Sequence, residues 1–377
     1  MRNASIAFDG MTASALALVS DQVRNGRPVV GYAFDSIGRY GKGGLLRDRF
    51  IPRILSASSK ELLDGDSLPD PQAFVRIAMR NEKQGGHGER PGAIGLIEAA
   101  AWDLRGKLMG QALWEMLAAD EGEESDRGAA RSISVYGSCG HFRPGRGEAE
   151  LSGLAEEVRQ ARSQGFDLVK IKLGGVSVAD DEARVESAMA AAQGGKIAVD
   201  VNGGLSQDIE GPWLRAMNRL GVAFIEEPAP ALDFQRLSKI AEQCDSPLAT
   251  GENLFSFDDA RNLLRYGGLR ADQDLIQIDV SLSYGIGEYR RILDAFERAG
   301  WSRSAFVPHA GHLFAAQVVG GLRLGMHEAA TDPSAMFSGL WSGTELTAGR
   351  AALPHHVGTG FEHHPALFYV LRDLAVQ

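Results

Sequence analysis

The chain has 377 residues, which is enough to bury a large core and to form two domains, and its formal net charge of −10 argues against a nucleic-acid partner, which would favour a basic surface. Its two cysteines, Cys139 and Cys244, are too few for a disulfide framework and are typical of a reducing compartment. The sequence begins without a signal-peptide pattern, and no apolar run reaches the roughly 18 residues of a membrane span, so we expect a cytoplasmic protein that does not enter a membrane.

The first third of the chain predicts an α+β unit. Two strands, near 12–20 and 28–34, are joined at Asn25-Gly26, a pair typical of a hairpin turn. Apolar residues at helical spacing predict a helix over 94–108, and a short helix is expected over 111–118. The glycine-rich residues before them, 38–44, could form either a mobile flap or a surface turn. The acidic residues 120–128 then provide the best candidate for a linker.

Strands and helices alternate from residue 133 onward, which indicates a parallel sheet covered by helices. An eighth strand is needed to close a barrel and is expected within 325–345, where no pattern locates it. The last 40 residues have no clear period, and we expect them to pack on the first unit. The strands predicted from apolar runs lie near 132–137, 167–173, 197–201, 222–226, 247–250, 274–279 and 304–308.

Three acidic residues at equal spacing follow successive strands. Asp200, Glu226 and Glu252 are separated by 26 residues each, about one strand-helix unit of a barrel. A single acidic residue after a strand is more often a helix cap, but three in this pattern predict a metal site. Carboxylate oxygens at the catalytic end of a barrel suit Mg²⁺. By strand alternation Glu227 should point away from Glu226.

Two lysines are expected inside the barrel. In the strand over 167–173, Lys170 and Lys172 alternate with Val169, Ile171 and Leu173, whose apolar side chains should meet the helices. Burial beside a second lysine and a divalent cation would lower a lysine pKa toward neutrality, with Lys170 tuning the pKa of Lys172. Lys172 is therefore a candidate general base, and the alternative is a structural pair that neutralises the carboxylates.

Asp279 and His309 also lie at predicted strand ends, 30 residues apart. An Asp at a neighbouring strand end can hold one nitrogen of the His ring and leave the other for acid–base work. His87 and His312 could only support the site from further out.

These groups indicate chemistry at the α-carbon of a carboxylate. Mg²⁺ would stabilise the enediolate that forms when Lys172 removes the α-proton. His309 would then protonate either a departing β-hydroxyl, which is dehydration, or the opposite face of the α-carbon, which is racemisation.

Together these motifs resemble the mandelate racemase subgroup of the enolase superfamily. The resemblance runs through 101–107, Lys170-x-Lys172, 226–228, 251–253 and the Asp279/His309 pair. It implies an enolase-like α/β fold, a modified TIM barrel of the (β/α)₇β type with an α+β capping domain. The implied capping domain spans 1–125 and is completed by the tail at about 345–377, and the barrel spans 126–344. The resemblance also implies Mg²⁺ bound by Asp200, Glu226 and Glu252, Lys172 as the base and His309 as the acid.

Local stretches, including 81–90 and 249–256, are similar to the D-tartrate dehydratase branch of that subgroup. This similarity implies that Asn3, Lys83 and Asn202 contact the substrate. Two features depart from the branch: we expect no counterpart of the first strand of the capping sheet, and Ile37 stands where a polar, substrate-facing Asn is expected. An apolar residue there could remove a hydrogen bond worth about 1–3 kcal/mol.

Three functions remain open from the sequence. The favoured one is a Mg²⁺-dependent lyase that dehydrates a hydroxydiacid or acid sugar to a 2-keto acid. The second is a racemase or epimerase that uses the same Lys/His pair, and the third is a barrel that only binds an acid. In each case the expected partner is a small carboxylate, and we expect a homo-oligomer.

Overall fold

The computed structural model describes residues 13–35, 41–85, 87–122, 131–142, 148–332 and 339–375. Two residues singled out in the sequence lie outside the described residues: Asn3, a proposed substrate contact, and Ile37, which differs from the Asn expected in the D-tartrate dehydratase branch. No helix among those described is long and apolar enough to cross a bilayer.

The chain begins with the predicted antiparallel hairpin. Strands β1 (Ala15–Arg24) and β2 (Arg27–Phe34) pair with each other. They are joined by Asn25 and Gly26, whose φ values of 50° and 74° lie in the left-handed region that a tight hairpin turn requires. The predicted hairpin is therefore confirmed.

Helices follow the hairpin, and the longest of them, α5 (Glu89–Met109), is buried along most of its length. It packs against β2 on one side and reaches the barrel helix α12 (Ile286–Arg298) on the other, which explains why it lacks a polar face. The other helical segments are α1 (Gly43–Leu45), a π-helical turn (Leu46–Phe50), α2 (Ile51–Leu55), α3 (Ser59–Leu62), α4 (Pro71–Ala78) and α6 (Leu113–Asp120).

A parallel sheet forms the barrel, and its strand order around the sheet is β9-β3-β4-β5-β6-β7-β8. The expected eighth strand is β9, which pairs with β3. The barrel strands are β3 (Ser132–Cys139), β4 (Leu168–Lys172), β5 (Lys196–Asp200), β6 (Ile225–Glu226), β7 (Leu248–Thr250), β8 (Leu275–Ile276) and β9 (His327–Ala330).

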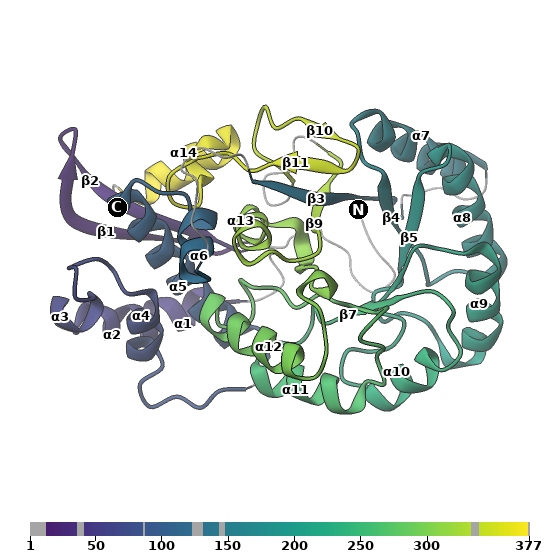
Figure 1. Ribbon diagram of the computed structural model, residues 1–377, viewed down its shortest axis with the longest axis horizontal. Helices are drawn as coiled ribbons and strands as arrows, with labels where there is room; N and C mark the ends of the chain where they lie inside the picture. Colours follow the sequence, from purple (N-terminus) through teal and green to yellow (C-terminus); the bar gives the residue numbers. More distant parts are fainter. Residues whose placement is uncertain are drawn as a thin grey trace.

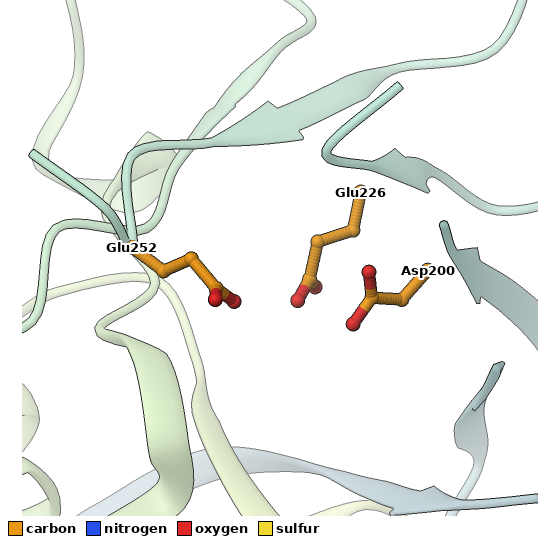
Figure 2. A group of neighbouring side chains, drawn as sticks. All are labelled: Asp200, Glu226 and Glu252. Atoms are coloured by element: carbon orange, nitrogen blue, oxygen red, sulfur yellow. The ribbon is translucent and has the colours of Figure 1, made fainter. Parts of the chain in front are cut away.

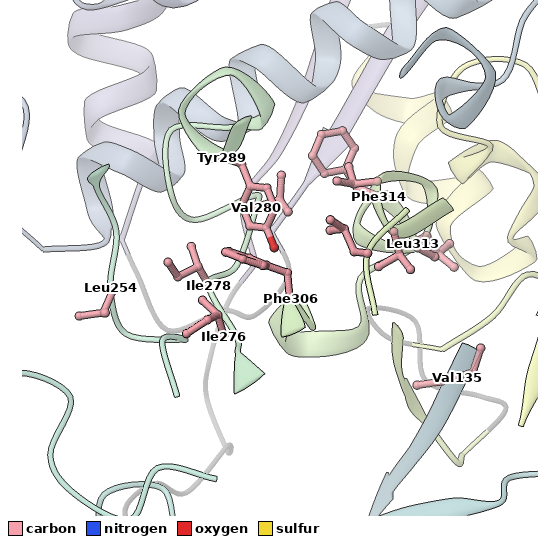
Figure 3. Close-up of a cluster of buried hydrophobic side chains, with 14 of the residues drawn as sticks. Val135, Leu254, Ile276, Ile278, Val280, Tyr289, Phe306, Leu313 and Phe314 are labelled. Atoms are coloured by element: carbon pink, nitrogen blue, oxygen red, sulfur yellow. The ribbon is translucent and has the colours of Figure 1, made fainter. Parts of the chain in front are cut away.

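The prediction of a strand near 304–308 is wrong. Residues Arg303–Ala305 form a 3₁₀ turn, and a single bridge between Ile276 and Phe306 joins this region to β8. Phe306 nevertheless packs inside the apolar layer beside Ile276, Ile278 and Tyr289 (Figure 3). Apolar burial therefore produced the strand-like pattern without a hydrogen-bonded ladder.

Helices cover the outside of the sheet, as Figure 1 shows for α7 to α12, which follow one another around its rim. This arrangement confirms the predicted α/β barrel with an α+β unit beside it. Besides α12, the barrel helices are α7 (Glu148–Ser163), α8 (Val178–Ala192), α9 (Gln207–Leu220), α10 (Phe234–Ala241), α11 (Phe257–Tyr266) and α13 (Leu313–Leu322).

The C-terminal tail contacts both parts of the molecule. Strand β11 (Arg350–Ala352) pairs antiparallel with β3, and β10 (Leu346–Thr347) pairs antiparallel with β11. Helix α14 (Pro365–Leu374) contacts β1. Thr359 donates from its backbone N–H and its hydroxyl to Asp103 on α5. The boundaries given for the capping domain and the barrel stay a prediction.

Candidate active site

The predicted carboxylates meet at the carboxyl ends of the strands. Lys172 on β4 lies in register with Asp200 on β5, and Asp200 with Glu226 on β6, so the pleat turns all three side chains to the same face. Glu252 lies two residues past the end of β7. Figure 2 shows the three carboxylates converging, and one oxygen from each lies within 4.8 Å of the others.

This cluster fits a hard divalent cation. All three carboxylates are buried, and within the described residues they are the one group of three acidic, His or Cys side chains arranged to hold a metal. Burial, followed by the negative charge of Asp200, raises the pKa of Glu226 to about 8. Buried carboxylates this close together repel one another, and oxygen donors alone are the ligands that Mg²⁺ prefers.

Two buried ammonium groups partly balance the carboxylates. Lys170 Nζ lies 2.7 Å from Glu226 Oε1 and 2.9 Å from Glu328 Oε1, while Lys172 Nζ contacts Asp200. Burial would lower the pKa of Lys172, but Asp200 together with Glu226 and Glu328 outweighs it, and the pKa is raised. The lowered pKa expected for Lys172 beside a bound divalent cation stays a prediction.

Asp279 and His309 come together as a pair. His309 Nδ1 lies 3.2 Å from Asp279 Oδ2, and His309 Nε2 lies 3.2 Å from Glu252 Oε2. Burial would lower the pKa of His309, but Glu252 and Asp279 raise it above its usual value. The imidazolium form is thereby favoured, which suits a proton donor. Lys172 thus adjoins the Asp200 end of the cluster and His309 adjoins the Glu252 end.

Two groups at the site were missed in the sequence. Glu328 on β9 is buried, and one of its carboxylate oxygens, Oε2, has no hydrogen-bond partner among the described residues. Burial would raise its pKa, but Lys170 and His309 lower it, so the side chain is anionic. His141 follows β3, and burial together with the charge of Lys172 lowers its pKa to about 3, which keeps the ring neutral. Locating the eighth strand would have drawn attention to Glu328.

Glu227, which was predicted to point away from Glu226, is not one of the three carboxylates that group together. The backbone leaves the extended conformation at this residue, where φ is +45°. Its carboxylate accepts a hydrogen bond of 2.7 Å from Asn253 Nδ2, which also donates to Glu252. Burial, and then the charges of Glu252 and Asp200, raise the pKa of Glu227 well above its usual value.

The proposed substrate contacts differ in their surroundings. Asn202 donates to both oxygens of Asp200, from its backbone N–H at 2.8 Å and from its Nδ2 at 3.1 Å, so it orients a carboxylate of the cluster. Lys83 is exposed, and its carbonyl accepts a hydrogen bond from Arg90. Contact of Asn202 and Lys83 with substrate stays a prediction.

The two histidines expected further out have defined neighbours. His87 is exposed, with its ring centroid 6.0 Å from that of Phe255, three residues past Glu252. His312 is buried, lies 3.0 Å from the carbonyl of Phe34 and accepts from the N–H of Phe314 at the start of α13. Burial lowers the pKa of His312 to about 4. His312 therefore joins the end of β2 to the segment that follows His309.

Comparisons with known proteins agree with this geometry. The chain is 26% identical over 296 residues to L-talarate/galactarate dehydratase from Salmonella typhimurium, a match that covers 77% of this chain and 67% of that protein. It is 28% identical over 226 residues to D-galactonate dehydratase from Variovorax paradoxus, covering 58% of this chain and about half (53%) of that protein.

The fold is shared with solved structures. A racemase from Streptomyces coelicolor A3(2) with bound magnesium superposes with a TM-score of 0.72 at 18% identity, covering 94% of this chain and 91% of that one. At this identity the likeness concerns the fold alone. Residues 153–367, more than half of the chain, match the family described as Enolase C-terminal domain-like. The chain therefore belongs to the enolase C-terminal domain-like family.

Proposed function

We propose that this protein is a Mg²⁺-dependent dehydratase that converts an acid sugar or a hydroxydiacid to a 2-keto acid. The observation that carries the proposal is the order of groups across the site, with Lys172 against Asp200 at one end and His309 3.2 Å from Glu252 at the other. An acid whose carboxylate lay at the carboxylate cluster would have an amine and an imidazole on opposite sides of its α-carbon. Two relatives named as sugar-acid dehydratases support the reaction class.

Asp200, Glu226 and Glu252 would hold the metal. When bound there, Mg²⁺ supplies positive charge that offsets Asp200 and stabilises the negative charge that builds on the substrate carboxylate. The magnesium in the related racemase structure supports this choice of ion.

The side chains then have separate tasks. Lys172, as the neutral amine, takes the α-proton, and the electrons of that C–H bond move into the enediolate. When the enediolate collapses, its electron pair forms the C2–C3 double bond and the bond from C3 to the hydroxyl breaks. His309 gives its proton to the departing oxygen, which leaves as water, and the enol becomes the 2-keto acid. Asp279 holds Nδ1 of His309, so that Nε2 faces the site.

The reaction class is tested with a substrate panel. Purified protein with Mg²⁺ is incubated with aldaric acids, aldonic acids and tartrates, and 2-keto acid is measured as its semicarbazone. We expect at least one acid to be dehydrated, and we expect no product with excess chelator. If no acid in the panel yields a keto product, the dehydratase proposal is wrong.

A racemase would use the same two flanking groups, and the opposed arrangement of Lys172 and His309 favours it as the second candidate. Proton NMR in D₂O separates the two reactions. Deuterium at the α-carbon with inverted configuration and no keto acid would identify a racemase, whereas keto acid formation identifies the dehydratase.

A finer proposal is that the substrate is a short hydroxydiacid such as D-tartrate, supported by the similarity of 81–90 and 249–256 to the D-tartrate dehydratase branch. Ile37 would weaken binding of such a substrate. We expect Ile37→Asn to raise kcat/KM for D-tartrate by about tenfold, the equivalent of one recovered hydrogen bond. An unchanged kcat/KM would remove D-tartrate from consideration.

We further propose that the protein is cytoplasmic and forms a homo-oligomer. Analytical ultracentrifugation tests the second point, and a single species at the 40.4 kDa mass of one chain would contradict it.

A further inference from the structure

Asp279, which holds His309, is itself held by the backbone that follows it. Its Oδ1 atom accepts hydrogen bonds from the N–H of Ser281 at 2.8 Å, from the Ser281 hydroxyl at 2.7 Å and from the N–H of Leu282 at 3.2 Å. The other oxygen, Oδ2, lies 3.2 Å from His309 Nδ1. The direction of Oδ2 therefore depends on where residues 281–282 lie.

Helix α5 of the N-terminal unit packs directly against residues 281–282. A Cβ atom added to Gly95 would lie 2.2 Å from the carbonyl oxygen of Ser281, and one added to Gly92 would lie 3.2 Å from Leu282. Only glycine allows the helix backbone to approach so closely. The apolar residues on either side of Asp279 in sequence, Ile278 and Val280, are fully buried in the apolar cluster (Figure 3).

Glu98, one turn further along α5, fixes the far end of the same segment. It is completely buried and accepts hydrogen bonds from the N–H groups of Ile286 and Gly287, the first two residues of α12, the latter at 3.0 Å. It also accepts from Gln72 Nε2 on α4. Gly285, with φ of +92°, passes so close that an added Cβ would collide with the Glu98 carboxylate. A carboxylate at a helix N-terminus satisfies amides that have no partner within the helix.

We propose that Glu98 is a positioning residue for the acid side of the site. By anchoring residues 285–287 to α5, it holds the segment from Asp279 to Gly287 in the position that turns Asp279 Oδ2 toward His309. Glu98 touches neither substrate nor metal ligand, and its effect passes through Asp279. This inference rests on the proposed function, in which His309 protonates the leaving hydroxyl.

Asp103, a second buried carboxylate on α5, provides a matched control. It accepts from the N–H of Tyr32 at 2.8 Å and from the N–H and hydroxyl of Thr359, and it pairs with Lys107. These contacts join α5 to β2 and to the C-terminal tail, and among the described residues Asp103 has no hydrogen bond to residues 279–287. Substitution of Asp103 therefore disturbs the same helix without disturbing the Asp279 segment directly.

The test separates the two proton transfers. Glu98→Gln and Asp103→Asn are assayed in D₂O, and the rate of α-deuterium exchange, which needs Lys172, is compared with the rate of dehydration, which also needs His309. In Glu98→Gln we expect the ratio of dehydration to exchange to fall by about tenfold, because a small misplacement of an acid group is costly. In Asp103→Asn both rates should change together and leave the ratio within about twofold of wild type. Equal ratios in the two variants would overturn the proposal.

A second measurement does not require activity. Hydrogen exchange of the amides of residues 281–287, followed by mass spectrometry, should show lost protection in Glu98→Gln and none in Asp103→Asn. Ser281→Ala, which removes one bond to Asp279, should reproduce the shifted ratio if Glu98→Gln fails to fold. If wild type neither exchanges nor dehydrates any acid, the proposed function fails, and unchanged protection at 281–287 would then reject the positioning role separately.

Discussion

The two flanks of the carboxylate cluster are built in different ways. On one flank Lys172, Asp200 and Glu226 end adjacent strands in direct register. On the other flank β8 has only two residues, and a single bridge joins it to the chain that leads to His309. A hydrogen-bonded ladder fixes the first flank from local sequence, whereas the second depends on contacts from a distant helix.

The backbone supports differ in the same way. Arg184 on the barrel helix α8 is buried and donates to the carbonyl of Gly140 at 2.7 Å and to that of Lys172 at 3.1 Å. Glu98, the proposed support of the Asp279 segment, comes from α5, and its bond to Ile286 spans 188 residues of sequence. The proposed base is thus supported by a helix of the barrel, and the proposed acid by a helix of the N-terminal unit.

The largest effect is expected at the base. Lys172→Ala should lower both α-proton exchange and dehydration by about 10⁴-fold, because it removes the proposed base, the amine that contacts Asp200 at the edge of the cluster. Exchange and keto acid formation are measured on the same sample in D₂O. If Lys172→Ala still exchanged the α-proton, the base would not lie on the flank formed by Lys172, Asp200 and Glu226.

A smaller loss of activity, limited to dehydration, is expected when His309 on the other flank is replaced. His309→Asn removes the proton donor but leaves Lys172 in place, so dehydration should fall by about 10²–10⁴-fold while exchange continues. If His309→Asn lost exchange and dehydration to the same extent, Lys172 and His309 would not carry out separate proton transfers.

Magnesium binding should distinguish two neighbouring glutamates. Glu226→Gln removes a charged ligand and is expected to weaken Mg²⁺ binding by at least about 100-fold in calorimetric titration. Glu227→Gln is the control: burial and Glu252 raise the pKa of Glu227, so an amide there resembles the protonated acid and should change the affinity by less than about tenfold. Equal losses would place Glu227 among the ligands.

A moderate effect on the two rates is expected when Arg184, which supports the backbone near Lys172, is replaced. Arg184→Met removes two hydrogen bonds to the backbone beside Lys172 and should lower exchange and dehydration together, by about tenfold. The ratio of the two rates should stay at the wild-type value, in contrast to Glu98→Gln. A changed ratio would contradict the separation of the two supports.

The smallest effect concerns stability rather than rate. Burial raises the pKa of Glu98 to about 7 in the folded protein, although its hydrogen bonds act in the opposite direction. Below about pH 4.5 Glu98 is protonated in the folded and the unfolded chain alike. As the pH rises from about 4.5 to about 7, only the folded chain keeps the proton, so the free energy of unfolding falls by roughly 3 kcal/mol. Glu98→Gln should flatten that part of the pH dependence in urea unfolding, and identical pH profiles for wild type and variant would contradict it.

The sequence predicted the flank formed by Lys172, Asp200 and Glu226 well, because each of its signals lies within a short stretch of sequence or in a regular spacing. Apolar runs located β4 and β5, alternation turned Lys170 and Lys172 inward, and the equal spacing identified the carboxylates. The fold class followed from the same alternation of strands and helices.

The failures have a common physical cause, which is that they depend on backbone turns or distant contacts. The left-handed φ of Glu227 departs from the regular alternation of a strand, and the short β9 has no period that would have drawn attention to Glu328. The contact between Lys172 and Asp200 joins two strands, and counting charges along the sequence does not reveal it. Glu98 looks like any other residue of a helix until residues 285–287 are seen beside it.

The central claim is that Lys172 and His309 act on opposite sides of an acid held at Asp200, Glu226 and Glu252. The most direct test is a crystal structure of the His309→Asn protein with Mg²⁺ and an acid that wild type dehydrates. We predict the metal between the three carboxylates and the α-carbon of the acid about 3–3.5 Å from Lys172 Nζ, with its β-hydroxyl toward residue 309. A ligand bound elsewhere, or a lysine turned away from the α-carbon, would contradict the claim.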